Sequence, residues 1–278
     1  MGRQRKQALE NKGWPAAVAL FFKATLLLWF LSLIMAMKIE GRTNLWPILA
    51  RCIFYQTANY AVKLWLSKDP LFINTAVSLL HSTITSASVM LVLLHEWIDK
   101  GARKMFDHEE LFNGLWLGAF KALCFSCGYF AYDQWDMLNN HLYNPQAPSL
   151  LVHHALLLVC FSLALYRFVT INYLILTLVC ELHSIFLHLR RVLRMAGLRR
   201  ERSLRTRIEW GIHWFTFFTA RLFTHWFITY KLIKDASKFP RGIELPLAVS
   251  GMVGMNVLNI FLGFDIFKAC KKELIGAS

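Results

Sequence analysis

The residues that could do chemistry in this chain of 278 amino acids are a few titratable side chains set inside apolar stretches. Between Ser149 and Leu189 the sequence has one acid, Glu181, and one fixed base, Arg167. The same tract carries four histidines, which are His153, His154, His183 and His188. Titratable groups are costly inside a membrane span, so such residues are by default hypotheses for a functional site.

Glu181 lies about half-way along its apolar stretch and shares a helix face with Ser184 and His188, at positions i, i+3 and i+7. A carboxylate at that depth needs a partner, and Arg221, half-way along the apolar run 211–232, is the natural candidate. We therefore expect Glu181 and Arg221 to face each other. Two interpretations of the pair stay open, a structural tether and a part of a functional site.

A second set of polar residues lies on both sides of the loop 132–149, between two apolar stretches. Asp133 shares a helix face with Tyr129 and Asp136, and His153 and His154 open the next stretch. A histidine can act as a general base, whereas helix-end residues can also simply be solvated by interface water. The sequence predicts that five residues from successive spans line one lipid cavity, with the two adjacent histidines as catalytic candidates: Asp133, His153, His154, Glu181 and His188.

We expect no metal site and no cofactor. His183 and His188 are five residues apart, which is not the i, i+4 spacing of a helical zinc pair. Cys124 and Cys127 form a C-x-x-C motif, but inside an apolar helix they are best interpreted as small packing residues.

The elements that must position these residues are apolar helices. Hydrophobic residues make up 56% of the chain and the mean hydropathy is +0.41, well beyond an ordinary soluble domain. Runs of about 20 apolar residues, enough to cross a bilayer, occur at Ala16–Met37, Phe72–Leu94, Leu111–Ala131, Leu150–Phe168, Ile171–Leu189, Gly211–Leu232 and Leu245–Phe267. An eighth run, Pro47–Leu66, is weaker because it contains Arg51 and Lys63. The fold class expected is an all-α integral membrane protein, a multipass bundle of seven or eight spans.

The net charge of +14 is confined to short segments between these runs, which argues against a nucleic-acid partner. Eight arginines fall within eighteen residues: Arg190, Arg191, Arg194, Arg199, Arg200, Arg202, Arg205 and Arg207. This segment predicts a cytoplasmic loop that attracts anionic lipid headgroups or the phosphates of an acyl-CoA. Counting spans from it places His153 and His154 near the cytoplasmic side.

The order of these motifs resembles the TLC-domain family, which includes ceramide synthases and the translocating-chain-associated membrane protein. The resemblance covers roughly residues 72–270, between an N-terminal segment with one or two anchoring helices (1–71) and a short tail (271–278). It rests on Ser78–Ser82, Gly128–Asp133, His153-His154, Leu178–Ser184 and Phe186–Arg191. It implies a six-helix barrel, built from the last six spans, around a cavity open toward the cytoplasm.

Within the family the sequence is most similar to small TLC-domain-containing proteins that regulate phospholipid acyl composition and membrane fluidity. The resemblance therefore implies a regulator that limits polyunsaturated acyl chains in membrane phospholipids, in the plasma membrane or the endoplasmic reticulum. In ceramide synthases the paired histidines, matched by His153 and His154, belong to the acyl-transfer centre. However, Cys180 and Ser184 occupy positions where those enzymes carry a histidine and an aspartate. An acyl-CoA-dependent acyltransferase and a lipid-binding trafficking adaptor remain the alternatives.

The first testable prediction concerns orientation. A cysteine introduced at Ser203, inside the arginine-rich segment, should react with a membrane-impermeant thiol reagent only when the cytosolic face is accessible. Labelling from the lumenal or external side would overturn the orientation, and with it the placement of the two histidines.

Overall fold

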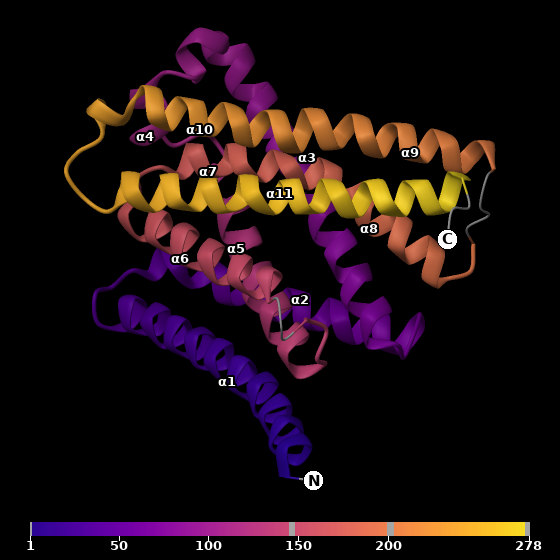
Figure 1. The fold of residues 1–278 in the computed structure, drawn as a ribbon. Helices are drawn as coiled ribbons and strands as arrows, with labels where there is room; N and C mark the ends of the chain where they lie inside the picture. The colour runs from indigo at the N-terminus through magenta and orange to yellow at the C-terminus, as the bar shows by residue number, and fades with distance from the viewer. Residues whose placement is uncertain (1, 145–147, 199–202, 276–278) are drawn as a thin grey trace.

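The computed structural model describes residues 2–144, 148–198 and 203–275, and in these ranges the chain is helical with connecting turns and no strand (Figure 1). Its α-helices are α1 (Gly2–Lys38), α2 (Trp46–Trp65), α3 (Pro70–Met105), α4 (His108–Phe112), α5 (Ala119–Asn139), α6 (Ser149–Arg167), α7 (Ile171–Thr177), α8 (Glu181–Met195), α9 (Leu204–Thr216), α10 (Thr224–Lys234) and α11 (Glu244–Ile275). A 3₁₀ turn, η2 (Leu178–Cys180), joins α7 to α8, and a π-helical segment, η3 (Phe217–Phe223), joins α9 to α10.

Five of the described helices are long and apolar enough to cross a membrane: Ala16–Lys38, Pro70–Met105, Ser149–Arg167, Ile171–Met195 and Glu244–Leu274. The all-α membrane class expected from the sequence is therefore confirmed. The other three expected spans are helical as well, as α2, α5 and the rod α9–η3–α10. Helices α2 and α5 contain more polar residues, and the third rod is divided by its π-helical segment.

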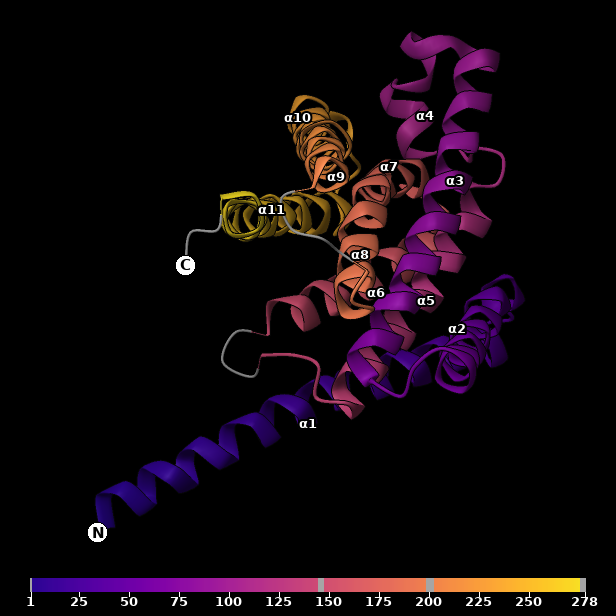
Figure 2. The same ribbon diagram turned by 90° about the vertical axis from the view of Figure 1, so that its right-hand side faces the viewer.

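Six rods form the body of the molecule: α3, α5, α6, α7–η2–α8, α9–η3–α10 and α11. The rods α9–η3–α10 and α11 run side by side and form one flank, and α3 lies on the opposite flank (Figures 1 and 2). Helix α2 packs against α5 and α3, and α1 contacts α5 and α6 before diverging from the bundle (Figure 2).

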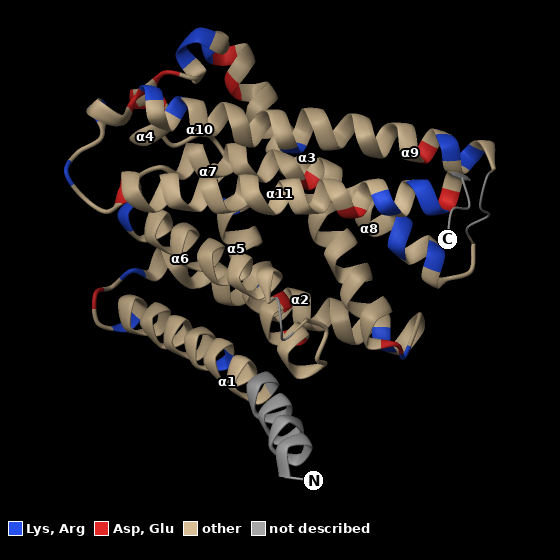
Figure 3. Cartoon of the chain, in the orientation of Figure 1, with Lys and Arg blue, Asp and Glu red and all other residues tan. Residues whose placement is uncertain are grey.

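Charged residues lie mainly at the two ends of the bundle, while the middle of the rods is almost uncharged (Figure 3). Lys and Arg cluster near the end of α8, the start of α9 and the end of α11, which we call the basic end. Lys and Arg also lie at the opposite end, near the ends of α3 and α10, where they are mixed with Asp and Glu. Three arginines of the basic segment, Arg199, Arg200 and Arg202, lie outside the described residues.

The boundaries of one span differ from the sequence expectation. The apolar run Leu111–Ala131 predicted a helix there, but Leu111 lies in α4 and α5 begins only at Ala119. Gly118, with φ of +84°, adopts a left-handed conformation that delays the helix start. At the other end α5 continues past Asp133 and Asp136, which are buried rather than solvated. Hydrogen bonds from neighbouring helices allow both acids to remain inside.

The predicted span Gly211–Leu232 contains an irregularity that hydropathy could not reveal. Its centre, η3, is π-helical and includes Arg221. A π-helical segment inserts an extra residue into the turn and re-aims the side chains that follow, and such segments occur frequently at functional sites. Here it directs Arg221 and the next helical turn toward the interior of the bundle.

Helices α2 and α5 approach most closely at Gly128. The thiol of Cys52 donates a hydrogen bond to the Gly128 carbonyl oxygen over 3.5 Å. A Cβ atom on Gly128 would lie 2.5 Å from the Cβ of Arg51 and 2.9 Å from the carbonyl oxygen of Ile48. Both contacts are closer than van der Waals radii allow, so the glycine sets the distance between the two helices.

The second prediction tests this contact. Gly128→Ala should push α2 away from α5 and lower the unfolding free energy by about 1–3 kcal/mol, measured as a lower melting temperature in detergent. Gly254→Ala is the matched control, because a Cβ there meets nothing within 4 Å. Equal melting temperatures for the two variants would show that the α2–α5 contact is not tight.

Candidate functional site: a polar cavity among six helices

The six rods enclose a cavity of about 470 Å³, within the roughly 300–1,000 Å³ typical of ligand pockets. Its lining residues on α11 extend from Glu244 to Asp265. At a rise of about 1.5 Å per residue this is roughly 30 Å, so the cavity follows the helices over most of their membrane length. Its shape suits an elongated ligand better than a compact one.

The structure brings all five sequence-predicted cavity residues to this one space. Asp133 comes from α5, His153 and His154 from the start of α6, and Glu181 and His188 from α8. Arg221 also lines the cavity. The fourth histidine of the tract, His183, does not: it is fully buried, and its Nδ1 lies 3.4 Å from the Oγ1 of Thr216.

One polar cluster joins α3, α5 and α6. The Nδ1 atom of His154 lies 3.5 Å from the Oδ2 of Asp133, whose Oδ1 accepts a hydrogen bond of 2.7 Å from the Asn74 amide. The same amide nitrogen donates to Asp136 over 3.0 Å. The Nδ1 of the adjacent His153 has no hydrogen-bond partner. A histidine beside a carboxylate, with a second imidazole next to it, can hold or move a proton.

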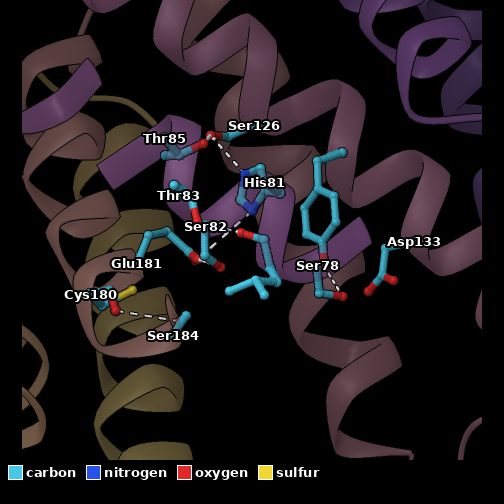
Figure 4. A network of polar contacts seen from close by, with 12 residues as sticks. Ser78, His81, Ser82, Thr83, Thr85, Ser126, Asp133, Cys180, Glu181 and Ser184 are labelled. Carbon is cyan, nitrogen blue, oxygen red and sulfur yellow. Dashed lines mark hydrogen bonds and ion pairs between the residues drawn. The ribbon is translucent and has the colours of Figure 1, made fainter. Parts of the chain in front are cut away.

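A second cluster fixes Glu181 against α3 (Figure 4). The Ser82 hydroxyl donates to the Glu181 Oε2 over 2.6 Å, and the His81 Nδ1 lies 3.8 Å from the same oxygen. The His81 ring stacks on Tyr129 with the ring centroids 3.8 Å apart, and its Nε2 lies 3.3 Å from the Ser126 hydroxyl. The Ser82 hydroxyl of α3 thus donates to the buried carboxylate, and no Lys or Arg nitrogen lies within 4.0 Å of that carboxylate in the described chain.

Glu181 and Arg221, which we expect from the sequence to face each other, both line the cavity, but they form no ion pair within 4.0 Å in the described chain. Arg221 instead donates from Nη2 to the Ser184 hydroxyl over 2.7 Å and from Nη1 to the Asn259 Oδ1 over 3.3 Å. The physical reason is that α3 engages Glu181 while η3 directs the guanidinium toward α11. Ser184, one turn after Glu181, separates the two groups.

Sequence reasoning missed several polar cavity residues, of which His225 is the most informative. Its Nδ1–H donates to the Arg221 carbonyl oxygen over 2.7 Å, and its Nε2, in a fully buried side chain, has no hydrogen-bond partner. The signal was present, because His225 follows Arg221 by one helical turn. Asn74 and Asn259 were missed too, although each is an amide inside an apolar run.

The part of the chain that forms the six rods is also the part that is similar to known proteins. A family model described as TLC domain matches residues 71–268. TLC domain-containing protein 2 of Danio rerio is 27% identical over 197 residues, 70% of this chain and 75% of that protein. TLC domain-containing protein 2 of Mus musculus is 30% identical over 193 residues, 69% of this chain and 58% of that protein. No solved structure matches the chain.

The third prediction concerns the Glu181 cluster. Ser82→Ala removes the donor to a buried carboxylate and should lower the unfolding free energy by about 1–2 kcal/mol in detergent. In a Glu181→Gln background the same change should matter less, because a neutral acceptor makes a weaker hydrogen bond.

Thr83→Ala is the matched control, since its hydroxyl bonds only the carbonyl oxygen of Leu79 in its own helix and the residue is exposed. Equal losses for the Ser82 and Thr83 variants would show that the hydrogen bond to Glu181 contributes nothing specific to stability.

Proposed function

Because the chain belongs to the TLC-domain family, we propose that it regulates the acyl composition of membrane phospholipids, and hence membrane fluidity, by holding lipid acyl chains in its cavity. In this proposal the protein limits polyunsaturated chains in phospholipids. The observation that carries the proposal is the mixed lining of the cavity, in which polar groups such as Asp133, Glu181 and Arg221 face the same space as leucine and methionine side chains of α6 and α11.

The apolar side supports an acyl-chain ligand. Leu156 and Leu163 of α6 face the cavity together with Met255 and Leu258 of α11. A Cβ atom on Gly251 would lie at an ordinary van der Waals distance, 3.8 Å, from a Leu156 methyl carbon, so α6 and α11 pack against each other there. Leucine and methionine side chains adapt to chains of different shape, as a lipid-binding wall requires.

The polar side supports an amphiphilic ligand rather than a hydrocarbon. Hydrogen-bonding groups of Asp133, His153 and Arg221 face the same cavity as the apolar wall. Near the basic end of the bundle the lining also includes His188 and Arg191. In the proposal, Arg190–Arg207 attracts anionic headgroups and the cavity accepts the chain attached to them.

A specific contact favours a second candidate function, acyl transfer from an acyl-CoA. The His154 Nδ1 lies 3.5 Å from Asp133, the arrangement in which a carboxylate orients a general base. Such a histidine would take the proton of a hydroxyl or amine acceptor as it attacks the thioester carbonyl, and the CoA thiol would leave. Catalytic hydrogen bonds are often long without substrate, so this separation permits the chemistry.

The fourth prediction tests the proposed function and separates the two candidates. Cells lacking the protein should show a larger polyunsaturated fraction in their phospholipids, with ceramides unchanged, when measured by lipid mass spectrometry. Re-expression of the normal protein should reverse the change. His154→Ala should also reverse it if chain binding is enough, and should fail if the histidine is a catalytic base.

His95→Ala serves as the matched control, because this side chain is 54% exposed and lies outside the cavity lining. It should rescue fully under either candidate. Phospholipid acyl composition that does not change on removal of the protein would contradict the proposed function itself.

A further inference from the structure

Arg221 is a fixed positive charge deep inside the bundle. It lies near the middle of the rod α9–η3–α10 and is 9% exposed. Its hydrogen-bond acceptors, Ser184 and Asn259, are neutral, and no acid oxygen lies within 4.0 Å of it in the described chain. Its Nε has no hydrogen-bond partner. A buried guanidinium without a close anion is costly, which points to a missing anionic partner.

The protein's own acids do not fill this role. Glu181 of α8 lines the same cavity as Arg221, but its Oε2 accepts a hydrogen bond from the Ser82 hydroxyl and it forms no ion pair with Arg221 within 4.0 Å. His153, His188 and His225 line the same cavity, but a histidine supplies no negative charge whether or not it is protonated. Within the described chain, every negative charge therefore lies farther from Arg221 than the 4.0 Å of a salt bridge.

Two more polar atoms beside Arg221 also lack partners. The amide nitrogen of Asn259 has no hydrogen-bond partner, whereas its oxygen accepts from Arg221. The Nε2 of His225 is a free acceptor, because its Nδ1–H donates to the Arg221 carbonyl oxygen. Both side chains are at most 1% exposed, and both line the cavity. A cationic donor and an amide donor thus face one space, with the His225 Nε2 beside them.

We propose that this Arg221 site binds the carboxyl group of a free long-chain fatty acid, whose chain lies along the apolar wall of α6 and α11. The planar guanidinium and the Asn259 amide N–H would donate hydrogen bonds to the carboxylate oxygens. The acid binds as its carboxylate, and its proton is released to water. A single arginine suits a carboxylate better than a phosphate that carries more charge.

This inference deepens the proposed function by naming the ligand class, and it rests on that function. It adds that the cavity distinguishes a free acid from an esterified chain. A regulator of acyl composition would then respond to the unesterified fatty acids from which phospholipid chains are built.

The fifth prediction tests the site with purified full-length protein in nanodiscs of uncharged phospholipid. Radiolabelled oleate, methyl oleate and oleoyl lysophosphatidate serve as probes of matched chain length. The protein should retain oleate about tenfold more strongly than methyl oleate, because the ester cannot pair with the guanidinium. Equal retention of acid and ester, or stronger retention of the lysophosphatidate, would overturn the proposal.

Asn259→Asp supplies the decisive variant. It places a carboxylate where the Asn259 oxygen lies 3.3 Å from the guanidinium, which should preserve the fold as an internal ion pair and exclude the ligand. Oleate retention should fall about tenfold while methyl oleate retention is unchanged. Asn256→Asp is the matched control, because Asn256 lies one turn away on α11, donates to Thr229, and is outside the lining.

Unchanged oleate retention in the Asn259→Asp protein would overturn the site. The two proposals fail separately, because the lipid analysis of cells does not depend on this binding measurement. Normal regulation of phospholipid chains without an oleate preference would refute only the fatty-acid site. Oleate binding that depends on Asn259, without any effect of the protein on phospholipid chains, would refute only the proposed function.

Discussion

The structure depends on one constraint, which is that a polar group facing lipid has no water to bond. Each rod of the bundle carries a short polar stripe on an otherwise apolar surface. Asn74 on α3, Asp133 on α5 and His154 on α6 come together only because the three helices turn these stripes toward the same interior. The same helix packing that keeps these polar groups away from lipid therefore also creates the polar cavity.

The same constraint explains why the buried charges do not simply neutralise each other. Glu181 accepts a hydrogen bond from Ser82 on α3, and Arg221 donates to neutral groups on α8 and α11 while its Nε has no partner. Each charge therefore has hydrogen bonds but no close counterion. A closed ion pair would be a purely structural device, whereas a guanidinium with unused bonding capacity beside an apolar wall can recognise an amphiphile.

Much of this could be predicted from the sequence, because both hydropathy and the cost of buried charge are local properties. Apolar runs located the helices, and the membrane cost of Asp133 and Glu181 indicated a shared interior. The start of α5 was predicted wrongly, because hydropathy does not register the left-handed Gly118. The partner of Arg221 could not be predicted either, since the π-helical η3 changes the side-chain direction without changing composition. Helical periodicity assumes a regular turn, and it fails where the turn is irregular.

The central claim is that the cavity, rather than the outer surface of the bundle, holds an acyl chain. Photo-crosslinking with a diazirine-bearing fatty acid, followed by peptide mass spectrometry of the protein in nanodiscs, tests it most directly. The account predicts adducts on cavity-lining residues of α6 and α11, such as Leu156 and Met255, that excess unlabelled oleate suppresses. Adducts confined to outward-facing residues such as Leu27 and Leu28 of α1, and insensitive to competitor, would contradict it.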